Sequence, residues 1–293
     1  KIENNKMLKF QVKSLEKDVN LAEQKFIKYQ DSFKDDYIIN LNSVLLNTCY
    51  DYNFDKNISQ KVYISHDIDN LGNTNYSRNF ININENSQIL LIENFSNKLE
   101  SNQNIINFFE IQKNSELIHL IIQNNTVDSN LQFTTHTNCY ENSKYKQIIF
   151  NVCSSSSRNH HYVNFLEKNA EANLYGVFFG SADQIIDNKT QANHFAENCK
   201  SEQKYKGILR DNSKGNYMSK TYVDKIAQKT EAYQLSKGII LSENSFFHSK
   251  PELKIYADDV KCSHGSTIGP IDKNAIFYLR SRGMSKNAAT KIL

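Results

Sequence analysis

The sequence is poor in the residues that bend or interrupt a chain. It has no tryptophan, two prolines (Pro251 and Pro270) and nine glycines among 293 residues. Only Gly72 precedes residue 170, and the other glycines begin at Gly176. Glycine permits tight turns and close backbone approach. We therefore expect more of both in the second half of the chain.

Long apolar runs are also absent. None approaches the roughly 20 residues that a membrane-spanning helix needs, and the opening stretch "KIENNKMLKF" is not a hydrophobic signal segment. We expect a cytoplasmic protein with no membrane partner, bacterial in preference to plastid-type.

Several functional signatures are missing. The chain contains no GxxxxGK[ST], GxGxxG or GxSxG motif, so any ATP chemistry requires a site on a partner. The 35 lysines and arginines are nearly balanced by 32 acidic residues, and the two signs alternate along the chain. This pattern argues against a nucleic-acid partner.

The cysteines do not form a recognisable framework. They are five in number, widely spaced and without a CxxC pair: Cys49, Cys139, Cys153, Cys199 and Cys262. The spacing disfavours both a disulfide framework and a structural zinc site. We expect reduced thiols that are mostly buried.

Apolar periodicity predicts a mainly β protein with helical ends. Residues 1–47 have apolar side chains at helical spacing, with a break near Asp31 to Asp36. Residues 48–270 contain short strand-like runs, such as "KVYISH", "NFININ" and "SQILLIENF", separated by Asn, Ser and Asp. Residues 271–293 return to a helical pattern, with Asp272 and Ser285 as caps and Gly283 as a helix-ending residue.

The strand runs fit either a sandwich or a solenoid. No helical pattern separates the strands, which argues against an alternating α/β sheet. The strands recur without a domain break, hairpin dipeptides are nearly absent, and Asn-rich corners could satisfy turns with stacked amides. These features favour a solenoid of stacked β-coils.

The stretch "KIYADDVKCSHGSTIG", residues 254–269, carries the most suggestive pair of side chains. If residues 254–262 are extended, Asp258 and Asp259 bend or bulge the strand, and Cys262 and His264 then share one face. A thiolate and an imidazole suit iron, zinc or a sulfur-containing cluster. A catalytic dyad and two ordinary residues are the other interpretations. The adjacent His160 and His161, and also His194, are expected in surface or hydrogen-bonding roles.

Longer motifs resemble a known family. "DNKTQANHFAENCKSEQKYKGIL" (187–209), "AQKTEAYQLSKGIILSENSFFHSKPELKIYADDVKCSHGSTIG" (227–269) and "FYLRSRGM" (277–284) resemble the carboxy-terminal half of the SufB/SufD family of iron–sulfur cluster assembly scaffolds. "KCSHG" resembles the SufD form. The SufB form has an acidic residue after the histidine and a further cysteine near a Cys-Gly motif, whereas here Gly265 follows His264.

The resemblance implies a right-handed parallel β-helix flanked by helical segments, with a carboxy-terminal helical region that normally continues beyond Leu293. It implies a non-enzymatic subunit that pairs with a SufB-like chain, and a SufC-like ATPase docked near "AIFYLRSRG". His264, and with it Cys262, would contribute to a transient iron–sulfur cluster at the SufB interface, with His264 as the candidate metal ligand. The candidate docking residues lie on that helical segment: Phe277, Tyr278, Leu279, Arg280 and Arg282.

Two other function classes stay open from the residues alone. One is a β-helix polysaccharide lyase or hydrolase, and the other is a homodimeric binding module without metal. The resemblance also leaves open whether a flavin takes part in the complex.

Overall fold

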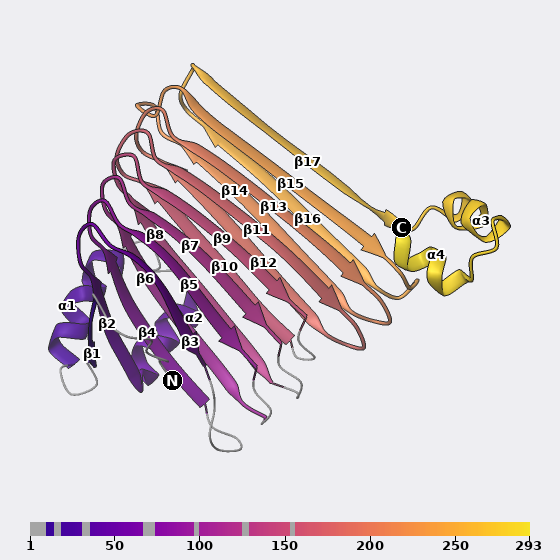
Figure 1. Ribbon diagram of the computed structural model, residues 1–293, viewed down its shortest axis with the longest axis horizontal. Coiled ribbons are helices and arrows are strands. Elements are labelled where there is room, and N and C mark those ends of the chain that lie inside the picture. The colour runs from indigo at the N-terminus through magenta and orange to yellow at the C-terminus, as the bar shows by residue number, and fades with distance from the viewer. Residues whose placement is uncertain are drawn as a thin grey trace.

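The protein is a parallel β-solenoid of about seven turns, with 61% of the residues that the structure describes in strands. The computed structural model describes residues 10–14, 19–30, 36–66, 74–96, 100–124, 129–152 and 156–293. Each turn contributes one strand to each of two sheets, so that strands two apart along the chain pair in parallel (Figure 1). The predicted solenoid is confirmed, and the sandwich is ruled out.

Sheet A contains the odd-numbered strands from β3 onward. In spatial order they are β3 (Ser59–Ser65), β5 (Gln88–Phe95), β7 (Glu116–Gln123), β9 (Lys144–Asn151), β11 (Glu171–Gly180), β13 (Lys200–Leu209), β15 (Thr230–Ile240) and β17 (Val260–Pro270).

Sheet B contains β1 and the even-numbered strands. In spatial order they are β1 (Phe10–Ser14), β2 (Thr48–Phe54), β4 (Thr74–Ile83), β6 (Asn102–Ile111), β8 (Asn130–Cys139), β10 (Ser156–Phe165), β12 (Ile185–His194), β14 (Lys214–Val223) and β16 (Phe246–Ile255).

Asparagines build the corner that precedes the strands of sheet A. Asn86, Asn114, Asn142 and Asn169 have φ between 56° and 62°, in the left-handed region that Asn tolerates better than most residues. Their side-chain amides form a ladder, in which each Nδ2 donates to the Oδ1 of the preceding turn over 3.0–3.1 Å. The members are 27 or 28 residues apart. The predicted stacking of amides at the corners is confirmed.

The space between the sheets holds a mixed apolar and polar core. Along most strands buried side chains alternate with more exposed ones, as expected when one face of each sheet points inward. Glu93 is fully buried and bonds His66 at 2.8 Å and His119 at 2.6 Å. Burial opposes ionisation of Glu93, but the hydrogen bonds from His119 and His66 outweigh it and hold the pKa of this carboxyl well below its usual value.

Glycines in the later turns make room for aromatic rings. Gly176 and Tyr205 are register partners, and so are Phe178 and Gly207. A Cβ added at Gly176 would lie 2.2 Å from the Tyr205 ring, and one at Gly207 would lie 2.4 Å from the Phe178 ring. Close approach therefore accounts for part of the glycine excess in the second half, as the sequence predicted.

The amino-terminal segment differs from the prediction. Helices α1 (Val19–Gln30) and α2 (Tyr37–Leu45) lie on either side of the expected break, whose residues 31–35 are outside the described residues. Residues 10–14, however, form β1, which pairs antiparallel with β2. The prediction of helix there was wrong, because β1 satisfies the backbone groups along that edge of β2.

Helices α3 (Lys273–Ser281) and α4 (Lys286–Ile292) lie beyond the end of β17 (Figure 1). The predicted caps are confirmed: Asp272 accepts from Asn274 N at 2.8 Å, Ser285 accepts from Ala288 N at 3.1 Å, and Gly283 has φ +91°. Within the described part of the chain, no helix is long and apolar enough to cross a membrane.

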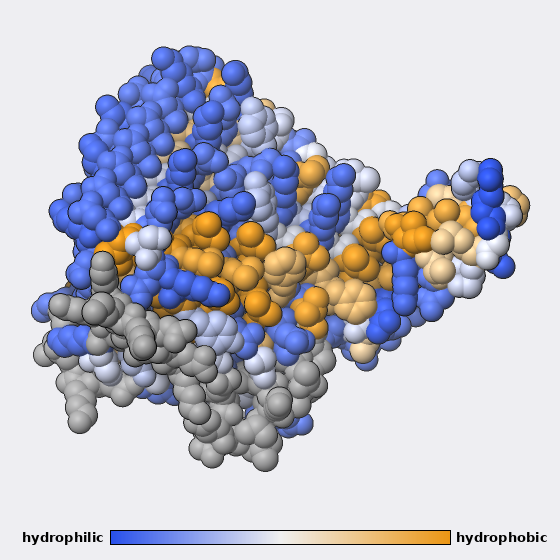
Figure 2. All heavy atoms as spheres, in the orientation of Figure 1, coloured by the Kyte–Doolittle hydropathy of each residue, from blue (hydrophilic) through white to orange (hydrophobic). Residues whose placement is uncertain are grey.

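One face of the molecule is divided by polarity. Figure 2 shows hydrophilic atoms gathered towards the corners, and a hydrophobic band that crosses the middle of the face towards the carboxy-terminal helices. Phe150 and Val177 are adjacent in register on the outer side of sheet A and are 44% and 39% exposed.

Candidate functional site

Cys262 and His264 lie on β17, the last strand of sheet A. They pair in register with Ala232 and Gln234, whose side chains are buried inside the solenoid. The two candidate ligands therefore face the same side, as predicted from their spacing. The expected bend at Asp258 and Asp259 is larger than a bulge, because these residues form the corner between β16 and β17. Residues 254–269 therefore lie partly in sheet B and partly in sheet A.

His264 ends a column of residues that share one register position in successive turns. The members from β7 onward are His119, Gln147, Leu174, Gln203, Gln234 and His264. Every earlier member is buried, at 4% exposure or less, whereas His264 is exposed. The order of sheet A ends at β17, so the described chain places no further turn over this imidazole.

Cys262 is half-buried and reduced. It packs against a small cluster formed by Val223, Ala227 and Ala257. Burial raises the pKa of the thiol, and a backbone hydrogen bond involving Ala232 offsets this only in part. The thiol is therefore mainly protonated at neutral pH and is the weaker of the two potential ligands.

The pair is incomplete as a metal site or a catalytic site. Both residues are described, and no hydrogen bond joins the thiol to the imidazole, so the thiol has no base positioned to take its proton. Over the ranges given above, no three His, Cys, Asp or Glu side chains gather to hold a metal ion.

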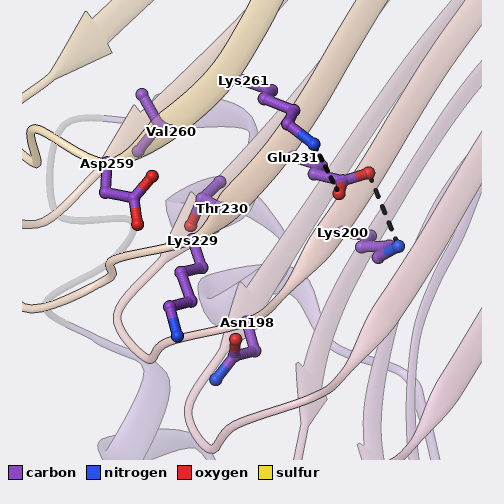
Figure 3. A pocket seen from close by; sticks show the side chains of 8 residues that line it. All are labelled: Asn198, Lys200, Lys229, Thr230, Glu231, Asp259, Val260 and Lys261. Atoms are coloured by element: carbon purple, nitrogen blue, oxygen red, sulfur yellow. Dashed lines mark ion pairs between the residues drawn. The ribbon is translucent and has the colours of Figure 1, made fainter.

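A pocket of about 370 Å³ lies at the corner that leads into β17 (Figure 3). Its lining consists of Asn198, Lys200, Lys229, Thr230, Glu231, Asp259, Val260 and Lys261. Figure 3 shows lysines from two different strands pointing at the carboxylate of Glu231. The distance from the Glu231 carboxylate oxygens is 3.5 Å to Lys200 Nζ and 3.8 Å to Lys261 Nζ. In the sequence only Asp259 of this lining stood out, as part of a bend, because strands about 30 positions apart in the chain come together only once the register is known.

The candidate docking residues lie on α3 and directly after it. Phe277 and Tyr278 are 73% and 57% exposed, Arg280 and Arg282 are exposed, and Leu279 is half-buried. The guanidinium of Arg282 lies 5.1 Å from the centre of the Tyr278 ring. The helix thus presents an aromatic and basic surface beyond the end of the solenoid.

The other histidines singled out in the sequence, His160, His161 and His194, have hydrogen-bonding roles, as expected. His160 pairs with Asp187 at 2.9 Å, whereas His161 points inward and bonds Thr135 at 3.0 Å. His194 bonds Ser201 at 2.9 Å. Burial lowers the pKa of all three.

Burial disfavours reactivity of the other described thiols. Cys49, Cys139 and Cys199 are buried, and Cys153 lies outside the described residues. Burial raises the pKa of Cys199 to about 11, and that of Cys139 still further.

Comparison with known families assigns the chain. The family model for "SUF system FeS cluster assembly, SufBD core domain" matches residues 64–293, which include the whole solenoid from the end of β3 and helices α3 and α4. The chain belongs to the SufB/SufD family. The resemblance drawn from the sequence motifs is confirmed, and membership supports a role in iron–sulfur cluster assembly.

Curated relatives agree with this SufB/SufD assignment. The iron-sulfur cluster assembly protein SufD of Escherichia coli is 36% identical over 111 residues, which cover 38% of this chain and 26% of that protein. A SufBD family protein of Synechocystis is 30% identical over 151 residues, covering 52% and 33%. The chloroplastic protein ABCI7 of Arabidopsis thaliana is 39% identical over 71 residues, covering 24% and 15%. The matches thus span about a third or less of these relatives.

Proposed function

We propose that this chain is a non-enzymatic scaffold subunit of a SufBCD-type complex. The solenoid end formed by β16 and β17 pairs with a SufB-like chain and holds one side of a nascent iron–sulfur cluster, which is the cargo of the assembly. One observation carries the proposal: His264 is the exposed last member of an otherwise buried column, on the terminal strand of a SufB/SufD-family fold.

The two side chains would act unequally. A neutral imidazole can bind iron directly, and His264 is already accessible. The Cys262 thiol must lose its proton before it can bind, and its raised pKa opposes this in the isolated chain. If complex formation made the Cys262 thiol less buried, its pKa would fall and the thiolate would become available as a ligand.

An ATPase docked on α3 could drive such a change. Only Ile271 and Asp272 separate the last residue of β17 from the first residue of α3. A displacement of the helix around Phe277 would therefore pass directly to the strand that carries His264. The aromatic and basic surface of α3 supports docking of a SufC-like partner, which would supply the nucleotide-binding motif that does not occur in this sequence.

The test is anaerobic co-expression with SufB-like and SufC-like partners, followed by mass measurement and by iron and sulfide analysis. His264→Ala should leave the mass of the complex unchanged and reduce bound iron and sulfide to background, because the cluster loses a ligand. His248→Ala is the control, since His248 is an exposed histidine on β16, the strand that precedes β17 in the chain and lies in the other sheet.

Normal cluster yield from the His264→Ala complex would contradict the proposed role. A wild-type chain that forms only metal-free homodimers would favour the simple binding module instead. Activity of the isolated chain on acidic polysaccharides would favour the β-helix enzyme.

A further inference from the structure

A second column, on the outer side of sheet A, alternates in charge. Successive strands place residues of opposite sign at one register position: Glu116, Lys144, Glu171, Lys200, Glu231 and Lys261. At the end of the column Glu231 bridges two lysines, Lys200 at 3.5 Å and Lys261 at 3.8 Å (Figure 3). Each internal member therefore lies between two residues of the opposite charge.

Lys261 is the exception because it ends the column. It lies on β17, whose outer edge pairs with no described strand, and its side chain is 76% exposed. It has a carboxylate on one side only. The adjoining pocket is lined by three lysines and two acidic residues, which leaves one positive charge in excess.

A strand added to this edge would put one side chain directly opposite Lys261. Directly opposed side chains in neighbouring strands have Cβ atoms about 4.5–5.5 Å apart, close enough for charge to favour or disfavour pairing. An Asp or Glu there would continue the alternation, whereas a Lys or Arg would face a positive charge. This holds whether the added strand runs parallel or antiparallel, because the pairing position alone is decisive.

We propose that Lys261, with the pocket beside it, selects the partner chain by requiring an acidic residue opposite it. The inference rests on the proposed pairing of β17 with a SufB-like chain and adds the chemistry that the partner must present. Complementary charge across an interface contributes more to specificity than to overall affinity. Lys261 therefore acts as a specificity determinant beside the cluster site, and not as a ligand.

The competing explanation is that Lys261 prevents other strands from pairing with the exposed edge of β17. Lysines on edge strands are a common protection against unwanted pairing. The two explanations predict opposite outcomes on neutralisation. Selection predicts that Lys261→Gln weakens pairing with the SufB-like chain, whereas protection of the edge predicts stronger pairing and self-association.

The experiment measures the dissociation constant for the SufB-like paralogue of the same organism, at low and at high salt. Lys261→Glu should weaken pairing about tenfold at low salt, less at high salt, and Lys261→Arg should bind like the wild type. Lys237→Glu is the matched control, because Lys237 is an exposed outer-face lysine on β15, opposite Thr267 and away from the edge. Unchanged circular dichroism would show that each variant folds.

A charge swap completes the test. One acidic residue of the partner's edge strand, when changed to Lys, should restore binding to Lys261→Glu and weaken binding to the wild type. Wild-type affinity in Lys261→Glu, or tighter pairing in Lys261→Gln, would overturn the selection role while leaving the proposed function intact. A wild-type chain that does not pair with the SufB-like chain at all would overturn both.

Discussion

Individual residues fix the corners of this solenoid. A left-handed backbone is unfavourable for most side chains, but Asn tolerates it because its short amide can bond locally. In successive turns the corner position is held by asparagine: Asn57, Asn86, Asn114, Asn142, Asn169 and Asn198. In the next turn of the solenoid, Lys229 occupies the corner position with φ 59°. Lys229 therefore keeps the geometry of the corner without the residue that favours it.

Lys229→Asn should stabilise the protein. The substitution relieves the cost of a left-handed lysine and places a second amide next to Asn198, so we expect a gain of about 0.5–1 kcal/mol in unfolding free energy. Urea unfolding monitored by circular dichroism measures it. Lys225→Asn is the control, since Lys225 is exposed in the same turn and its φ is not positive. An equal gain in both variants would show that the backbone of Lys229 is not the cause.

At this same scale, the sequence predicted part of the site. The spacing of Cys262 and His264 was enough to place them on one face, because side chains in a strand alternate. Their different exposure was not predictable from spacing, because it depends on where the stack of turns ends. The charge column and its pocket were equally hidden, since neighbours such as Glu231 and Lys261 are joined only by the register.

At the scale of elements, neighbouring strands pack by placing a large side chain on one strand against a glycine on the other. β11 and β13 each place one large ring over a glycine of the other, Tyr205 over Gly176 and Phe178 over Gly207. The fit depends on each glycine having no side chain, since these rings are buried at 1% exposure.

Gly207→Ala should therefore destabilise the protein. The new Cβ would lie 2.4 Å from the Phe178 ring, and overpacking of this kind costs about 1–3 kcal/mol. Thermal unfolding measures the loss as a lower midpoint. Gly269→Ala provides the comparison, because a Cβ at Gly269 meets nothing within 4 Å. A Gly207→Ala protein as stable as Gly269→Ala would mean that the ring moves aside without cost.

Elements also show where prediction from sequence failed. The strand runs between Asn-rich corners were recognised because each is bounded by its own turn chemistry. The periodicity of residues 1–47 predicts helix for the five residues of β1, but they form a strand because they pair with the edge of β2, about 40 positions away. A short segment that is stabilised by a distant edge carries little local signal.

For the whole molecule, the core makes stability depend on pH. Burial lowers the pKa of His194 from 6.5 to about 3 and that of His136 to about 4. Below pH 6.5 the unfolded chain binds protons at these positions and the folded chain does not, so stability falls as the pH falls. The loss is spread over the window from pH 6.5 down to the two lowered values.

His194→Gln should flatten this dependence. Removing one such histidine should shrink the stability difference between pH 6.5 and pH 5 by about 2 kcal/mol. Urea unfolding at both pH values measures it, and His248→Gln, on the exposed face of β16, serves as the reference. The same pH dependence in both variants would assign the acid sensitivity to other groups.

Because the solenoid is a stack of turns, its length could change only by whole turns. Each turn adds one strand to each sheet, so gain or loss of a turn would move the open end by about 4.8 Å. The surroundings of His264 would stay the same, because its neighbours come from its own turn and the one before. The number of turns, about seven here, therefore sets how far His264, the proposed cluster ligand, stands from the amino-terminal helices.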